Sequence, residues 1–145
     1  MAFRFPLAAV LRIRESIEMR EEHSLEKIQL EMARIAHQIE DLSAAIAKAY
    51  IAREQEMQQP VPASHLQMHI ARMQAATEKR KALFGEFQAL EQQRIKQLKV
   101  YQAAHRDRET LTDILNKQRN SYEHEQELAH QKQLDDVFVA RRQRV

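Results

Sequence analysis

Cysteine and tryptophan are absent from the 145-residue chain, and glycine occurs once, at Gly85. Without cysteine the chain can form neither disulfides nor cysteine-ligated zinc sites, which fits a reducing compartment. A single glycine cannot build a phosphate-binding loop or a dinucleotide-binding fingerprint. Catalytic groups usually lie on loops over a rigid scaffold, and the chain has almost no residues with which to make loops. We therefore expect no enzyme activity, no cofactor and no small-molecule substrate.

Long apolar runs are also absent, because no segment approaches the ~20 apolar residues that a membrane-spanning helix needs. The N-terminal stretch MAFRFPLAAVLRIRE places basic residues among its apolar ones. A signal peptide instead separates its charges from an apolar segment. We expect a cytoplasmic protein.

Proline is scarce too, but two of the three prolines, Pro60 and Pro62, lie close together. Proline removes a backbone donor and restricts the residue before it, so a helix cannot continue through this stretch. The rest of the chain is 30% charged and 6% aromatic, a composition typical of long helices and coiled coils. The sequence predicts an all-α fold over residues 1–145, a single antiparallel coiled-coil hairpin. Its helices are expected at about 6–58 and 64–140, with a bend at 59–63.

The first predicted helix has a heptad seam, in which apolar residues recur at alternating steps of three and four. Glu21 falls where this seam would continue upstream, which predicts a register shift there. Ser64 and Gln67 have the spacing of a capping box and predict the start of the second helix. The seam residues of the first helix are Leu25, Ile28, Met32, Ile35, Ile39, Leu42, Ile46 and Ala49.

The second helix shows helical spacing with a less regular seam. Gly85 in its interior is expected to be a tolerated surface glycine that costs roughly 1 kcal/mol relative to alanine. Polar residues are expected to break the seam at Thr77, Arg80, Arg94, His105 and Arg108.

The two arms are unequal in length. Folding the chain at Val61 places residue 115 near residue 7, so the last ~25–30 residues of the second helix overhang without an intramolecular partner. The overhang still carries apolar residues, and an unpaired helix with an apolar face is poorly supported by its own packing. We expect it to dock on another protein through Leu128, Leu134, Val137 and Phe138.

Charge is unevenly distributed along the chain. Residues 1–58 carry eight basic and ten acidic side chains, whereas residues 59–106 carry eight basic and three acidic ones. Opposite charge on the two arms suits a charge-matched hairpin. A basic helical nucleic-acid binder acting through residues 72–106 is the alternative interpretation, and it predicts steeply salt-dependent binding.

Histidine spacing gives little support for metal binding. His65 and His69 are four residues apart and share a helical face, but no third ligand lies at a suitable spacing. His124 and His130 are six apart and do not share a face. We therefore expect solvent-exposed histidines and no metal site. A solvated acidic face is the interpretation of Glu15, Glu18, Glu21, Glu22 and Glu26.

Both ends of the chain resemble those of FliJ-type flagellar export proteins. The opening matches that family at Phe3, Phe5, Leu7, Val10, Leu11 and Arg14. The closing stretch QKQLDDVFVARR is similar to the C-terminal helix of the family, with Leu134, Asp135 and Asp136 at the matching places. Asp136 stands where the family is expected to have glutamate, which keeps the charge.

The resemblance implies a soluble component of the flagellar type III export apparatus, similar to the coiled-coil part of the rotary ATP synthase gamma subunit. Such proteins insert into the pore of the hexameric export ATPase and promote its assembly and activity. They also contact the cytoplasmic domain of the export gate and the linker before it, and handle export chaperones. This implies a location at the cytoplasmic face of the inner membrane, at the flagellar base. A generic coiled-coil adaptor, or the equivalent stalk of a virulence secretion system, is the other alternative.

The resemblance also implies where the partners would bind. The ATPase would contact the paired ends of the hairpin, residues 3–14 together with roughly 118–142. The export gate would contact a region nearer the bend, at Tyr50. The expected ATPase-binding residues are Phe3, Phe5, Leu7, Val10, Leu11, Arg14, Leu128, Lys132, Leu134, Asp135, Asp136, Phe138, Arg141 and Arg142.

Overall fold

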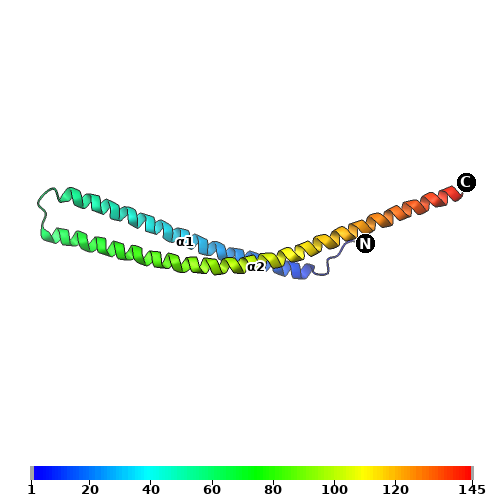
Figure 1. Ribbon diagram of the computed structural model, residues 1–145, viewed down its shortest axis with the longest axis horizontal. Helices are drawn as coiled ribbons and strands as arrows, with labels where there is room; N and C mark the ends of the chain where they lie inside the picture. Colours follow the sequence, from blue (N-terminus) through cyan, green and yellow to red (C-terminus); the bar gives the residue numbers. More distant parts are fainter. Residues whose placement is uncertain (1, 145) are drawn as a thin grey trace. The chain divides into compact units, whose positions relative to one another are not determined.

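The computed structural model describes residues 2–144, and two helices account for most of them. Helix α1 spans Ala8–Glu56 and helix α2 spans Ala63–Gln143, with 49 and 81 residues respectively (Figure 1). The predicted all-α fold, with a longer second helix, is confirmed. The described chain divides into two compact units: unit 1 comprises residues 2–20 and 102–144, and unit 2 comprises residues 21–101. No helix among residues 2–144 is both long and apolar enough to cross a membrane.

Unit 2 contains the bend between the helices. Beyond the last residue of α1, the amide of Met57 donates to the carbonyl of Arg53 at 2.9 Å, which closes the last turn of the helix. The carbonyl of Pro62 accepts from the amides of His65 and Leu66 at 3.0 and 3.4 Å. Pro62 therefore takes the N-cap position of α2, whose first residue is Ala63. The prediction that Ser64 caps this helix is wrong, because Ser64 lies inside the first turn.

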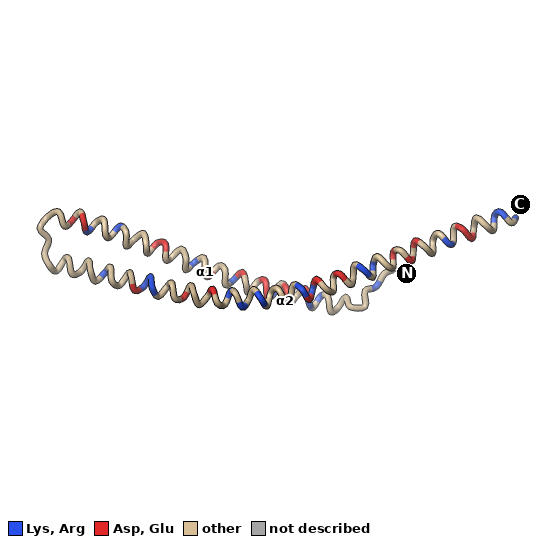
Figure 2. Tube along the Cα trace, in the orientation of Figure 1, with Lys and Arg blue, Asp and Glu red and all other residues tan. Residues whose placement is uncertain are grey.

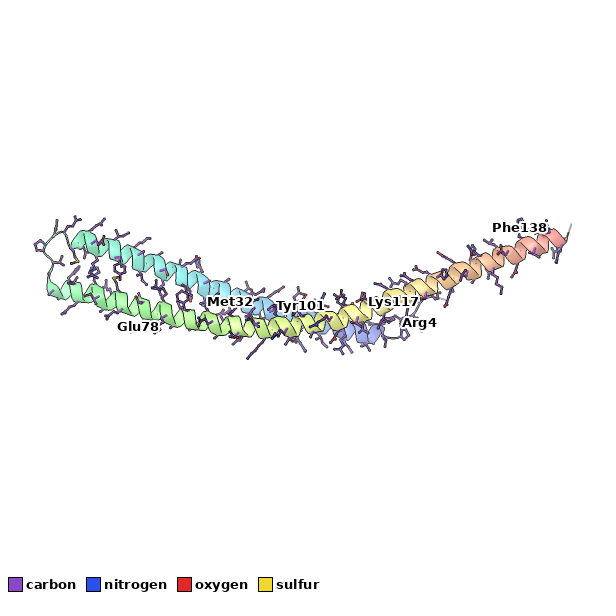
Figure 3. All side chains as sticks on the ribbon, viewed as in Figure 1. Arg4, Met32, Glu78, Tyr101, Lys117 and Phe138 are labelled. Atoms are coloured by element: carbon purple, nitrogen blue, oxygen red, sulfur yellow. The ribbon has the colours of Figure 1, made fainter. Side chains whose placement is uncertain are left out.

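The two helices of unit 2 run antiparallel on either side of the bend (Figure 1). The eight predicted seam positions of α1 are all buried or half-buried, which confirms the heptad seam. Ile35 is the most buried of them, with 2% of its surface exposed. Met32, which is labelled in Figure 3, is 9% exposed.

Polar residues occupy the seam of α2 without interrupting it. Steps of three and four continue through Arg80 and Arg94, which are half-buried, so the prediction that they break the seam is wrong. Thr77 is exposed and lies outside the seam. Long arginine stems can cover apolar surface while the charged group reaches a polar partner. The seam of α2 in unit 2 consists of Leu66, His69, Met73, Ala76, Arg80, Leu83, Phe87, Leu90, Arg94, Gln97 and Tyr101.

The same spacing continues along α1 before Leu25. Glu21, Glu18 and Arg14 are half-buried and Leu11 is buried, each at the next step of three or four. The predicted register shift is therefore wrong: the seam keeps its period and becomes polar. Its carboxylates are paired, as Gln97 Nε2 donates to Glu21 Oε2 at 2.6 Å and to the Glu21 carbonyl at 3.0 Å.

Unit 1 pairs the start of α1 with the second half of α2. On α2, Ala104 is buried at 7% exposure and Leu111 and Leu115 are half-buried. On α1, Leu11 is buried at 8% exposure. Residues 2–7 precede α1, and the amide of Ala8 donates to the carbonyl of Phe5 at 3.2 Å. Proline suits the second position of such a four-residue turn, so Pro6 ends in the turn before the helix rather than inside it.

Candidate functional site

Unit 1 brings together the aromatic residues that precede α1 and a tyrosine of α2. The rings of Phe3 and Tyr122 have centroids 5.5 Å apart and planes tilted by 45°, a geometry in which aromatic pairs attract. A shallow groove of about 300 Å³ runs beside them, lined in part by Phe3, Phe5, Leu11 and Leu115. Three of the predicted N-terminal site residues therefore share one surface. Tyr122 lies within the expected stretch 118–142, although it was not among the individually predicted contact residues.

Tyr122 is also the last half-buried residue of α2, since every described residue from 123 to 144 is exposed. Phe138 is 72% exposed and lies on the part of α2 beyond Arg4 (Figure 3). Leu134 and Val137 are 56% and 51% exposed. The expected overhang is therefore present within unit 1, and its predicted residues do not meet the N-terminal ones.

The overhang has two chemically different faces. Leu134, Val137, Phe138 and Arg141 are spaced i, i+3, i+4 and i+7, which places them on one face of a helix. Lys132 and Asp136 lie about 160–200° around the axis from Leu134, on the opposite face. Asp135 and Arg142 fall between these faces. Leu128, 51% exposed, lies about 120° from Leu134.

A cluster of charged side chains connects α1 to α2 in the paired part of unit 1. Arg108 Nε donates to Glu18 Oε2 at 2.5 Å, and His105 Nδ1 lies 3.0 Å from Glu18 Oε1. The hydrogen bond from Arg108, followed by that from His105, lowers the pKa of the Glu18 carboxyl, and the same pairing raises the pKa of Arg108. His105 and Arg108 were expected to break the seam, and that prediction is wrong because they pair with a seam carboxylate.

The remaining predicted N-terminal residues divide into accessible and engaged groups. Leu7 and Val10 are 38% and 41% exposed and remain accessible to a partner. Arg14 instead donates from Nη1 to Asp107 Oδ2 at 3.3 Å, so part of its role is to hold α2. Ile13, 58% exposed, adds an accessible apolar residue that lies within the expected stretch 3–14 but was not among its individually predicted contact residues.

Tyr50 lies in unit 2 and is 54% exposed. It lines a shallow groove of about 500 Å³ together with Arg53, Ile70 and Met73. Ile70 follows the apolar spacing of the second helix, yet it is 38% exposed. An aromatic ring beside exposed aliphatic side chains provides a surface on which another protein can pack.

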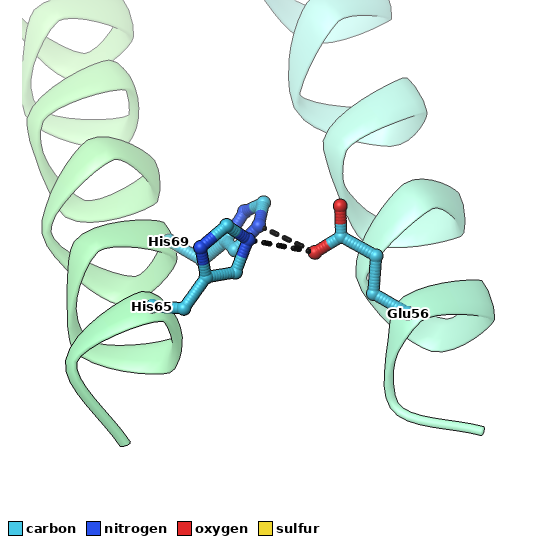
Figure 4. Close-up of side chains that lie close together, drawn as sticks. All are labelled: Glu56, His65 and His69. Atoms are coloured by element: carbon cyan, nitrogen blue, oxygen red, sulfur yellow. Dashed lines mark hydrogen bonds and ion pairs between the residues drawn. The ribbon is translucent and has the colours of Figure 1, made fainter. Parts of the chain in front are cut away.

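The histidines near the bend are not a simple exposed pair. His65 and His69 both approach the carboxylate of Glu56, the last residue of α1 (Figure 4). The side chains of His65, His69 and Glu56 are 49%, 21% and 47% exposed, in that order. These three residues form a group of potential metal ligands among residues 2–144.

Some of the basic residues of α2 already have polar partners. Acidic residues occur among the basic ones along both helices (Figure 2). Arg94 pairs with Glu91 at 2.6 Å, and Arg80 Nη1 donates to Ser43 Oγ at 3.4 Å. Since both arginines already have side-chain partners within unit 2, fewer positive charges are available for the phosphates of a nucleic acid.

Comparison with known proteins identifies the family. The family described as Flagellar FliJ protein matches residues 3–144, nearly the whole chain. No curated protein and no solved structure matches the chain. The chain therefore belongs to the FliJ family and is a component of flagellar type III protein export.

Proposed function

We propose that the chain is a stalk that binds the hexameric ATPase of the flagellar export apparatus and promotes its assembly and activity. Unit 1 is the part that enters the pore of the ring, with the overhang of α2 and the N-terminal aromatic surface as its contacts. The observation that carries the proposal is the exposed helix at 123–144, which retains Leu128, Leu134, Val137 and Phe138.

Apolar residues on an exposed helix favour a partner. Leucine and phenylalanine side chains gain roughly 1.5–3 kcal/mol each on full burial. The overhang has no α1 residue beside it within unit 1 to supply that burial, whereas a binding partner can. Because an unpaired helix is only marginally stable in water, a partner would also hold the overhang helical.

A ring suits the chemistry of the overhang better than a single groove does. A groove covers one face of a helix, and here it would bury Leu134 and Phe138 while leaving Lys132 and Asp136 in solvent. A pore surrounds the helix and can contact both faces at once. Charged residues on the second face would then orient the helix in the pore, since electrostatic complementarity sets specificity and register.

The exposed surface of unit 2 is proposed to bind the other export components. Tyr50 and the groove beside it would contact the cytoplasmic domain of the export gate or its linker, and export chaperones would bind along the helices. These contacts would hold the protein at the cytoplasmic face of the inner membrane, at the flagellar base.

Truncation after Tyr122 tests the proposed ATPase contact. We expect the truncated protein to keep the helical circular dichroism per residue of the full chain, because residues 123–144 support no other part of unit 1. We expect it to lose measurable binding to the ATPase and to stop stimulating its turnover.

Two point variants of the full chain refine the test. Phe138→Ala should weaken ATPase binding by about tenfold or more, as for a buried aromatic at an interface. Leu30→Ala is the matched control, because Leu30 is 71% exposed but lies in unit 2. Full ATPase binding by the truncated chain would contradict the proposal.

A further inference from the structure

We propose that Glu56, His65 and His69 form a binding site for a divalent transition-metal ion, with zinc as the best match. The site would connect the end of α1 to the start of α2 within unit 2 (Figure 4). This inference is independent of the proposed ATPase contact, which involves unit 1.

The three side chains converge on one point from opposite sides of the bend. Glu56 Oε2 lies 2.9 Å from His69 Nε2 and 3.3 Å from His65 Nε2. One ligand atom from each residue lies within 4.8 Å of the other two. The imidazole rings meet edge to face, with centroids 5.1 Å apart and planes at 70°. Both Nε2 atoms therefore approach the same carboxylate oxygen.

These distances are close to those of a tetrahedral zinc site. Zinc–nitrogen and zinc–oxygen bonds of about 2.0–2.2 Å place neighbouring ligand atoms about 3.3–3.6 Å apart in a tetrahedron. The observed carboxylate–imidazole separations of 2.9 and 3.3 Å need to open by only a few tenths of an ångström. The side chains of Glu56 and His65 are about half exposed and can make that adjustment.

The donor set selects the class of metal. Two imidazoles and one carboxylate suit zinc and other late first-row transition metals, whereas calcium and magnesium prefer oxygen ligands alone. Three protein ligands leave one coordination position for water.

The backbone explains why the ligands meet. His65 and His69 are four residues apart in the first turns of α2, and that spacing places both rings on one face. The bend between Glu56 and Ala63 returns the chain so that this face points at the end of α1 (Figure 4). A bound ion would cross-link the two helices next to the bend and stabilise the folded hairpin by mass action.

Calorimetric titration of zinc into the full-length chain tests the proposal. The protein should carry no polyhistidine tag and should first be stripped of metal with a chelator at about pH 7.5, since proton competition for the ligands makes metal affinity depend on pH. We expect one zinc ion per chain and, at a free zinc concentration about 100 times the dissociation constant, a rise in melting temperature on the order of 5 °C. Cobalt should give the visible absorption of a tetrahedral centre.

Variants identify the ligands. Glu56→Gln, His65→Ala and His69→Ala should each reduce zinc affinity by about tenfold or more, while circular dichroism shows unchanged helical content. His37→Ala is the matched control, because His37 pairs with Asp41 at 3.4 Å along α1 and lies outside the group of three. It should leave zinc affinity unchanged.

Glu56→Gln is the decisive variant. A histidine pair at i, i+4 can bind metal without help from the opposite helix, and in that case Glu56→Gln would bind zinc as tightly as the unmodified chain. That result would overturn the proposal, and so would the lack of saturable one-to-one binding.

Discussion

Arg108 donates a hydrogen bond of 2.5 Å to Glu18, although the two residues are 90 positions apart in the sequence. Their side chains are only 24% and 15% exposed, so the pair lies largely within the seam of unit 1. A carboxylate left there without its partner would lose a charge-assisted hydrogen bond.

Replacing one member of this pair should therefore destabilise the protein. We expect Arg108→Leu to lower the free energy of unfolding, as measured by the midpoint of urea denaturation, because Glu18 would lose a charge-assisted hydrogen bond. The double variant Glu18→Leu, Arg108→Leu should recover most of that loss, because apolar replacement of a buried ion pair is often neutral or stabilising. A double variant less stable than Arg108→Leu alone would contradict this account.

An exposed pair provides the control. Arg34 bonds to Glu31 one turn away on the same helix, and their side chains are 56% and 43% exposed. Arg34→Gln should leave the midpoint of urea denaturation nearly unchanged, because exposed ion pairs contribute little to stability.

Acid should weaken unit 1 through Glu18. The pKa of Glu18 is lower in the fold than in the unfolded chain, mainly because of the hydrogen bond from Arg108. The folded state therefore binds fewer protons, so this contribution is complete well above the unfolded pKa of about 4.3 and is lost as pH falls through the lowered folded value. Between about pH 6 and pH 3 the Glu18→Gln variant should lose less stability than the unmodified chain. Equal losses would show that Glu18 is not responsible.

Gly85 should be a site of easy stabilisation. A Cβ added to Gly85 would meet no atom within 4 Å outside its own helical turn, and the residue lies in the interior of α2. Gly85→Ala should raise the free energy of unfolding by about 0.5–1 kcal/mol. The reverse change at an exposed neighbour, Ala82→Gly, should lower it by a similar amount. A loss of stability in Gly85→Ala would reveal a close contact at this position and contradict the prediction.

The contact between Phe3 and Tyr122 should hold the segment before α1 in place. Tyr122→Ala should speed trypsin cleavage after Arg4 by about fivefold to tenfold, because cleavage follows the population of the opened segment. The variant is remote in sequence from the cleaved bond, so the protease recognition residues are unchanged. Tyr50→Ala in unit 2 is the control and should leave this cleavage rate as it was.

The sequence was sufficient to predict the helices and the apolar part of the seam. Leucine, isoleucine and methionine at steps of three and four indicate burial directly, as Ile35 and Met32 show. Polar residues at the same steps suggest breaks, although Arg80 and Glu21 are half-buried in register. Composition alone does not show that an arginine has a partner on the other helix, so its burial could not be predicted.

For the candidate sites, too, the sequence predicted some features and not those that depend on contacts between distant residues. The exposed apolar residues of the overhang could be predicted because unequal arm lengths follow from the position of the two prolines. The approach of Glu56 to His65 and His69 could not be predicted, because it depends on where each helix ends and on the path of the bend. Tyr122 could not be singled out within the stretch 118–142 for a related reason: its ring contact is with Phe3, in a segment without regular structure.

The pairing of the helices also has a kinetic consequence. Cross-helix contacts join residues 13 positions apart at Glu56 and His69, 37 apart at Ser43 and Arg80, and 93 apart at Arg14 and Asp107. The entropic cost of closing a loop rises with its length, so pairing should begin at the bend and zip toward the chain ends. The ends that are proposed to meet the ATPase would then be the last to close and the first to open. A partner could therefore change the order of that region at little energetic cost, while the bend stays paired.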